Sequence, residues 1–162
     1  MRFPRELLPL SIVLSNGVNF VLTLIPLVAI AIASGRPPSW LVLLLPVVMA
    51  IELLFLTGLA LFFGCLNVYL RDTEPIMEVL ILAWLFLTPI FYSLEDFNSP
   101  NTRLLYIVNP MASIISTYRL IFYYQAPPDA LFVLRMAAQA LLVFALGYWF
   151  FHRHAADFGE EV

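Results

Sequence analysis

The sequence has little charge and no lysine. Only 12% of its 162 residues are charged, against about 25% in an average soluble domain. All 8 of its basic residues are arginine, and the formal net charge of −3 excludes the strongly basic surface that binds nucleic acid. The single cysteine, Cys65, lies in an apolar run and allows neither an intrachain disulfide nor a cysteine-based zinc site.

Motifs for chemistry are also missing. The chain has no glycine-rich phosphate loop of the Walker type, so we do not expect it to hydrolyse ATP. It has no paired carboxylates and no nucleophile–base arrangement. His152 and His154 lie near Asp157 in the C-terminal tail, and we interpret them as a membrane-edge cluster, with a metal site as the alternative. We expect no cofactor and no enzymatic activity.

Hydrophobic residues are abundant instead. They make up 62% of the chain, against about 45–50% in soluble proteins. A small domain buries only part of the surface that it carries, so an aqueous fold of this length cannot hide so many apolar side chains. The composition therefore predicts one domain with lipid as its solvent.

Four apolar segments are long enough to cross a membrane as helices, which takes about 20 residues. These predicted spans are Leu7–Ala33, Trp40–Leu70, Ile76–Tyr92 and Leu131–Phe151. Aromatic residues at their ends fit the interfacial belts of membrane proteins: Trp40, Tyr69, Tyr92 and Trp149. With four spans, both chain ends lie on one side, and the arginines divide equally between the two sides, so charge does not fix the orientation.

The segment Leu104–Tyr124 has the length of a further span, but two features argue against one. Asn109-Pro110 favours a turn, and Arg119 would lie inside the bilayer, where an arginine costs about 2.5–3.5 kcal/mol. We predict two short helices that enter the membrane and return, against protein or a water-filled cavity. The predicted fold is an all-α integral membrane protein with four transmembrane helices plus a re-entrant helical pair between the third and fourth spans.

Polar residues inside the predicted spans are candidates for function. One side of the first span carries a polar residue every four positions: Ser11, Ser15, Asn19 and Thr23. This side faces either neighbouring helices or water. Glu52 is an ionisable group within the second apolar run, so it is a functional candidate, with snorkelling or a structural pair as alternatives. Arg135 either pairs with Glu52 or reaches the lipid headgroups.

Aromatic residues are dense around the predicted re-entrant segment. They include Phe91, Tyr92, Phe97, Tyr106, Tyr118, Phe122, Tyr123 and Tyr124. An interfacial belt explains most of them. A surface that stacks on sugar rings is the alternative.

Several stretches resemble the polysaccharide-export permeases, which belong to the type 2 group of ATP-binding-cassette (ABC) transporters. Residues 3–10, FPRELLPL, resemble the segment after their cytoplasmic coupling helix. Residues 66–92 resemble a signature formed by an Arg-Asp turn, a span, and Thr-Pro followed by an aromatic residue. Residues 109–122, NPMASIISTYRLIF, resemble the re-entrant element, and residues 151–162 the short cytosolic tail. The order and spacing of these stretches cover nearly the whole sequence.

This resemblance implies a homodimer in the bacterial inner membrane, with a cytosolic ABC ATPase subunit on each half. The pair exports a lipid-linked glycan such as O-antigen, capsular polysaccharide or teichoic acid. Phe3, Pro4 and Arg5 would lie near the ATPase contact, and Arg71 and Asp72 in a cytosolic turn. Three residues would belong to the outward re-entrant gate or the translocation path: Asn109, Tyr118 and Arg119. Cytosolic chain ends follow.

The sequence departs from the family in one respect. Family members have an amphipathic interface helix and two further spans before the FPREL segment. We therefore expect residues 1–162 to be a partial ABC transporter permease domain, incomplete as a transporter by itself. An ABC efflux permease for drugs or lipids and a non-transport membrane scaffold are the alternative functions. An intramembrane enzyme would have only Glu52 and the tail histidines to work with.

Overall fold

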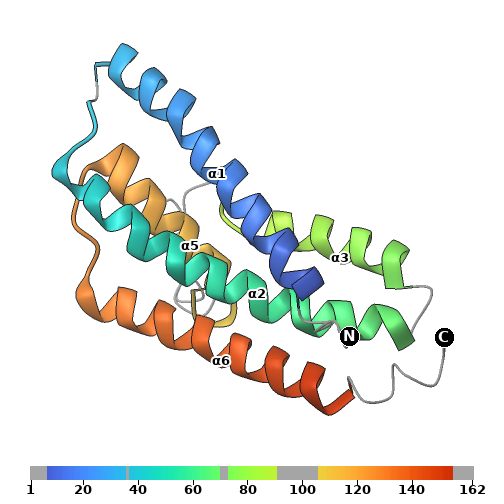
Figure 1. The fold of residues 1–162 in the computed structure, drawn as a ribbon. Coiled ribbons are helices and arrows are strands. Elements are labelled where there is room, and N and C mark those ends of the chain that lie inside the picture. The colour runs from blue at the N-terminus through green and yellow to red at the C-terminus, as the bar shows by residue number, and fades with distance from the viewer. Residues whose placement is uncertain (1–6, 36, 70–72, 91–105, 155–162) are drawn as a thin grey trace.

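The computed structural model describes residues 7–35, 37–69, 73–90 and 106–154, and these residues form helices joined by short connections (Figure 1). The elements in chain order are α1 (Leu7–Ala33), the 3₁₀ helix η1 (Trp40–Leu44), α2 (Leu45–Tyr69), α3 (Thr73–Leu87), α5 (Pro110–Arg119), the π-helical turn η3 (Leu120–Tyr124) and α6 (Ala130–His154). The predicted all-α class is confirmed.

Three of these helices are long and apolar enough to cross a membrane: Leu7–Ala33, Trp40–Asn67 and Ala130–His154. They coincide with the first, second and fourth predicted spans. The second is divided at its start, because η1 turns into α2 at Leu45. A long apolar run was therefore a sufficient signal for these helices.

In its described part, the third predicted span, Ile76–Tyr92, is helical only as far as Leu87. Helix α3 has 15 residues, or about 22 Å of length, which is less than the roughly 30 Å of bilayer hydrocarbon. Its last helical hydrogen bond runs from Thr88 N to Trp84 O. Pro89 follows, and a proline has no N–H with which to continue the helix.

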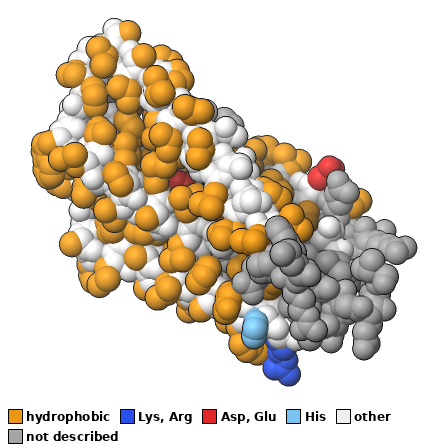
Figure 2. Space-filling model, viewed as in Figure 1, with side chains coloured by type: hydrophobic (Ala, Val, Ile, Leu, Met, Phe, Trp, Pro, Cys, Tyr) orange, Lys and Arg blue, Asp and Glu red, His pale blue; other side chains and the backbone are white. Residues whose placement is uncertain are grey.

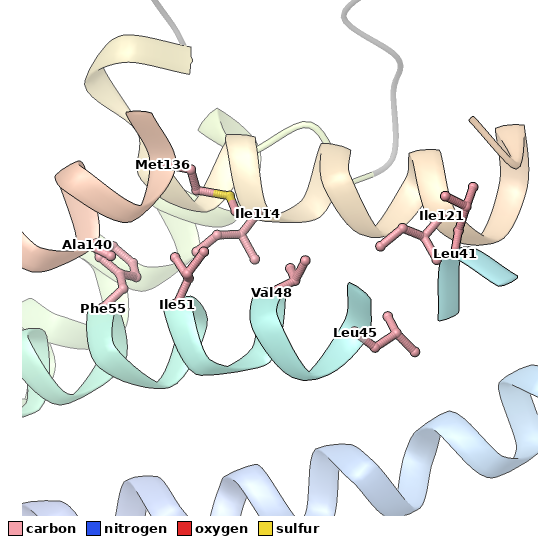
Figure 3. Packing of buried hydrophobic residues seen from close by; sticks show 9 residues of the cluster. All are labelled: Leu41, Leu45, Val48, Ile51, Phe55, Ile114, Ile121, Met136 and Ala140. Carbon is pink, nitrogen blue, oxygen red and sulfur yellow. The ribbon is translucent and has the colours of Figure 1, made fainter. Parts of the chain in front are cut away.

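Helix α2 is the centre of the fold and contacts α1, α3, α5 and α6. Its buried side chains recur every three or four residues and continue a line that begins in η1: Leu41, Leu45, Val48, Ile51 and Phe55. This line packs against Ile114 of α5, Ile121 of η3, and Met136 and Ala140 of α6 (Figure 3). The periodicity is that of one helix face, so the core is built along a single stripe of α2.

Helices α2 and α6 run side by side in the same direction (Figure 1). They cross at Gly58 and Gly147, where a Cβ built on Gly147 would lie only 2.0 Å from the carbonyl oxygen of Gly58. Further along, Cys65 of α2 and Phe151 of α6 belong to a second buried cluster. Paired glycines let two helix backbones approach this closely.

Helix α1 lies on α2 in the opposite direction and is far less buried. A Cβ on Gly64 would lie 3.8 Å from Pro9, and one on Gly17 would meet Leu53. Val13 is the one residue of α1 counted as buried. Asn19 is exposed, while the hydroxyls of Ser11 and Thr23 donate to carbonyls of their own helix.

The start of α1 and the end of α6 lie at the same end of the bundle (Figure 1). The opposite end holds residues 34–35, 37–39 and 124–129, and there Gln125 Nε2 donates to Pro37 O at 2.8 Å. Hydrophobic side chains cover most of the described surface in Figure 2. Exposed apolar residues occur on each of the three long helices α1, α2 and α6, for example Ile12, Val47 and Leu142.

The glycine crossing gives a test of this packing. We expect Gly147→Ala to lower the thermal denaturation midpoint of the purified protein, because the new methyl group would overlap a backbone carbonyl that cannot move alone. Overpacking of this kind costs about 1–3 kcal/mol. Gly64→Ala is the control, since its Cβ would be 3.8 Å from its nearest neighbour, Pro9 Cγ. Equal midpoints for the two variants in a size-exclusion thermal assay would contradict the close crossing.

Candidate functional site

The helix break at Asn109 organises the candidate site. Residues 106–108 are helical, Asn109 is extended (φ −114°, ψ 97°), and α5 begins at Pro110. The Asn109 side chain accepts a hydrogen bond from Met111 N at 3.1 Å, and so caps α5. Proline at the first helical position is favoured because its missing N–H would have no partner there. The break predicted from Asn109-Pro110 is confirmed, while most of the helix predicted before it lies outside the described residues.

Asn109 also joins the start of α5 to the end of α3. Trp84 Nε1 donates to Asn109 Oδ1 at 2.9 Å, and Asn109 Nδ2 donates to Thr88 Oγ1 at 2.9 Å. The Thr88 hydroxyl in turn donates to Trp84 O at 2.8 Å. Asn109 is only 5% exposed. Both the carbonyl oxygen and the amino group of this buried amide therefore have hydrogen-bond partners, as polar groups away from water require.

Arg119 makes a second connection between these segments. Its Nη2 donates to Pro89 O at 2.9 Å and to Ile90 O at 3.1 Å, two carbonyls just beyond the end of α3. Arg119 is also the last residue of α5, where a cation is favoured by the helix dipole. The arginine that argued against a lipid-exposed span thus lies against protein backbone.

Tyr118 and Glu52 form a pair that the sequence did not reveal. Tyr118 Oη donates to Glu52 Oε2 at 2.6 Å, which ties α5 to α2. Phe20 of α1 contacts the Tyr118 ring, with centroids 5.5 Å apart. Of the roles left open for Glu52, the structure therefore shows a pair, and the partner is Tyr118 and not Arg135.

Glu52 also lines a cavity of about 200 Å³ between α1 and α2. Asn16, Gly17 and Phe20 line it from the α1 side. Asn19, the stripe residue chosen from the sequence, is not among the lining residues. The polar face of α1 that approaches Glu52 is therefore the side of Asn16, one residue beside the predicted stripe.

Arg135 lies over the ring of Phe132, its own neighbour on α6, with Cζ 4.9 Å from the ring centroid. Its Nε and Nη2 atoms are buried and have no hydrogen-bond partner. Gln139, one turn later, donates through Nε2 to Ile107 O at 2.6 Å. Arg135 therefore packs as a flat cation on an aromatic ring.

Two further hollows flank α5. An apolar groove of about 510 Å³ lies between α2, α3 and α5, lined by Phe55, Trp84 and Met111 among others. A second hollow of about 250 Å³, here called the α5–α6 cavity, has a mixed lining that includes Tyr106, Ser116, Arg119, Tyr124, Asp129 and Phe132. Neither hollow could be predicted from the sequence, because the walls of each come from separate segments.

Five candidate residues lie outside the described part of the chain: Phe3, Pro4, Arg5, Arg71 and Asp72. The remaining candidates form two connected sets and two separate residues. Asn109 and Arg119 hold α3 to α5, Tyr118 joins Glu52, and Arg135 and Asn19 stand apart from both. Trp84 and Thr88 were missed, although their spacing of four residues places them on one face of α3.

The Asn109 connection gives a second test. We expect Asn109→Leu to speed hydrogen–deuterium exchange of the amides in residues 106–119, because the change removes the cap of α5 and leaves Trp84 Nε1 without its acceptor. A buried unpaired donor costs about 1–3 kcal/mol. Asn19→Leu is the matched control, since Asn19 is exposed on α1. Unchanged exchange in Asn109→Leu would show that the break is held by other contacts.

Comparison with known proteins places the chain in a family. Residues 4–123 match the family described as "ABC-2 type transporter". The whole chain is 34% identical to the O-antigen export system permease protein RfbA of Myxococcus xanthus, and covers 63% of that protein. Two proteins of the same name from Klebsiella pneumoniae are each 31% identical over 74% of this chain and 46% of their own length. The chain therefore belongs to the ABC-2 type transporter family.

Proposed function

We propose that this chain is the membrane-spanning permease subunit of an ABC exporter that moves a lipid-linked polysaccharide across the bacterial inner membrane. O-antigen, capsule and teichoic acid are the substrates to consider. The observation that carries the proposal is the alignment of the entire chain with an O-antigen export permease at 34% identity. Because the chain spans less than two thirds of that relative, residues 1–162 correspond to part of a permease domain.

The proposed topology has four crossings, of which the third is divided. Helices α1, α2 and α6 each have the length for a full crossing. Helix α3 starts at the end where α6 finishes, and η3 ends at the opposite end, beside Pro37. Together, α3 and α5 with η3 cover the third crossing, and the two segments meet at Asn109. This arrangement keeps the non-helical backbone against protein, as the bilayer requires.

The cytosolic end is proposed to be the one that holds the start of α1 and the end of α6. Phe3, Pro4 and Arg5 would then contact a partner ATPase, close to the turn of Arg71 and Asp72. ATP hydrolysis takes place on that partner, and the permease needs no cofactor. Asn109, Tyr118 and Arg119 lie toward the outer side and form the gate.

Two copies of the chain are proposed to enclose the path. The exposed polar stripe of α1, with Ser15 and Asn19, then faces water or the second copy, since lipid is a poor environment for it. The hydrogen bond between Glu52 of α2 and Tyr118 of α5 links the core helix to the proposed gate, and Phe20 of α1 packs on the Tyr118 ring. ATP-driven movement of the partner subunits would expose the path alternately to the two sides.

Export by a complemented strain tests the function. The chain is joined to the part of the Myxococcus xanthus relative that the alignment does not cover, and is expressed with a matching ATPase. We expect this fusion to restore surface glycan in a permease-null strain. The same permease with an ATPase that cannot hydrolyse ATP is the control, and should restore none. A correctly inserted protein that exports no glycan with an active ATPase would contradict the proposal.

Cysteine labelling tests the topology. With Cys65→Ser as background, we expect Ser34→Cys and Pro127→Cys to react with a membrane-impermeant maleimide in intact spheroplasts. Leu8→Cys and His152→Cys should react only after permeabilisation, because they lie at the other end of the bundle. Labelling of Leu8→Cys and His152→Cys from opposite sides would mean an odd number of crossings, and the permease assignment would fail with it.

A further inference from the structure

We propose that the α5–α6 cavity binds a single sugar ring of the glycan. The inference rests on the proposed function and refines it, since it locates a recognition site for the substrate within this chain. Three aromatic rings, one carboxylate, one guanidinium and one serine hydroxyl meet in this cavity. No other hollow among the described residues that is reported above combines aromatic walls with charges of both signs.

The size and place of the cavity suit one ring. Its volume is about 250 Å³, below the roughly 300–1,000 Å³ of sites for drug-sized ligands. It lies where η3 ends and α6 begins, at the end of the bundle that also holds Pro37. One ring can therefore enter from this end of the bundle while the rest of a glycan remains outside the cavity.

The aromatic walls are held in place before any ligand arrives. The rings of Tyr106 and Phe132 pack edge to face, with centroids 5.7 Å apart and planes at 79°. Ser116 Oγ donates to Tyr106 Oη at 3.2 Å, which leaves the tyrosine proton for a further acceptor. Fixed aromatic surfaces with a polar tip suit a ligand that has both apolar faces and hydroxyl groups, as a sugar ring has.

The charged groups favour a neutral ligand. Asp129 caps α6 through Oδ1, which accepts from Leu131 N at 3.2 Å, so its other carboxylate oxygen remains as an acceptor. Arg119 already donates to two backbone carbonyls. An anion would be attracted by Arg119 but repelled by Asp129, and a cation the reverse, so neither charge gains a net advantage in the cavity. A hydroxyl both donates and accepts, so it can bond to Asp129 and Tyr106 in turn.

Only some of the described aromatic residues near α5 line this cavity. Tyr118 points its hydroxyl to Glu52 on α2, and Tyr123 is 58% exposed beside the cavity residue Tyr124. Of the described aromatic residues around the re-entrant segment, Tyr106 and Tyr124 line the α5–α6 cavity, joined by Phe132 from α6. We therefore place the sugar-stacking surface on these three rings.

Saturation-transfer NMR tests binding directly. The full chain is placed in lipid nanodiscs prepared without glycoside detergents, and methyl hexopyranosides are the probes. We expect saturation transfer to the ring protons of at least one probe in the wild type. Phe132→Leu and Tyr106→Leu should weaken binding by about fivefold or more, because each removes a ring wall. Tyr148→Leu, a change at an exposed ring on the far end of α6, is the control and should bind as the wild type does.

A further variant separates recognition from folding. Asp129→Asn keeps a capping side chain at the start of α6, and should fold as the wild type while binding several-fold more weakly, since a charged acceptor is lost. The inference is overturned if no methyl hexopyranoside binds the wild type, if binding survives Phe132→Leu, or if glycerol 1-phosphate binds in preference. Export without such binding would refute this cavity and leave the proposed function intact. Sugar binding in a protein that supports no export would support the cavity as a sugar site and refute the proposed export function.

Discussion

The structure depends on one constraint: where a helix is interrupted among apolar surroundings, its backbone groups must find partners within the protein. The interruption at residues 88–90 and again at Asn109 would leave carbonyls and N–H groups unpaired. Side-chain atoms supply partners for such groups: Asn109 for Met111 N, Thr88 for Trp84 O and Arg119 for Pro89 O. The three residues replace the hydrogen bonds that a continuous helix would have made for itself.

The same constraint explains how polar and apolar residues are distributed. The face of the molecule seen in Figure 2 is mostly apolar, while hydrogen bonds between side chains join the helices inside, as at Tyr118 and Glu52. Helix α2 makes both kinds of contact, because it has a buried apolar stripe on one face and Glu52 beside that stripe. In a soluble protein, polar side chains would cover the outer face, because water would form hydrogen bonds with them there.

Much of the fold was readable from the sequence, because a long apolar run has few structural alternatives in lipid. Helices α1, α2 and α6 and the break at Asn109-Pro110 followed from run length and turn chemistry. The early end of α3 was missed, although Pro89 was visible. The Tyr118–Glu52 pair and the α5–α6 cavity were beyond reach, since they join residues far apart in the chain and no local periodicity records such contacts.

The crossing of Gly58 and Gly147 has a consequence for any passage through the molecule. Two backbones in direct contact leave no room for a lipid tail, a water file or a glycan between them. The seam between α2 and α6 is therefore closed along its middle. The looser packing among the described helices lies on the other flank of α2, where α1 has one buried residue and α3 stops short.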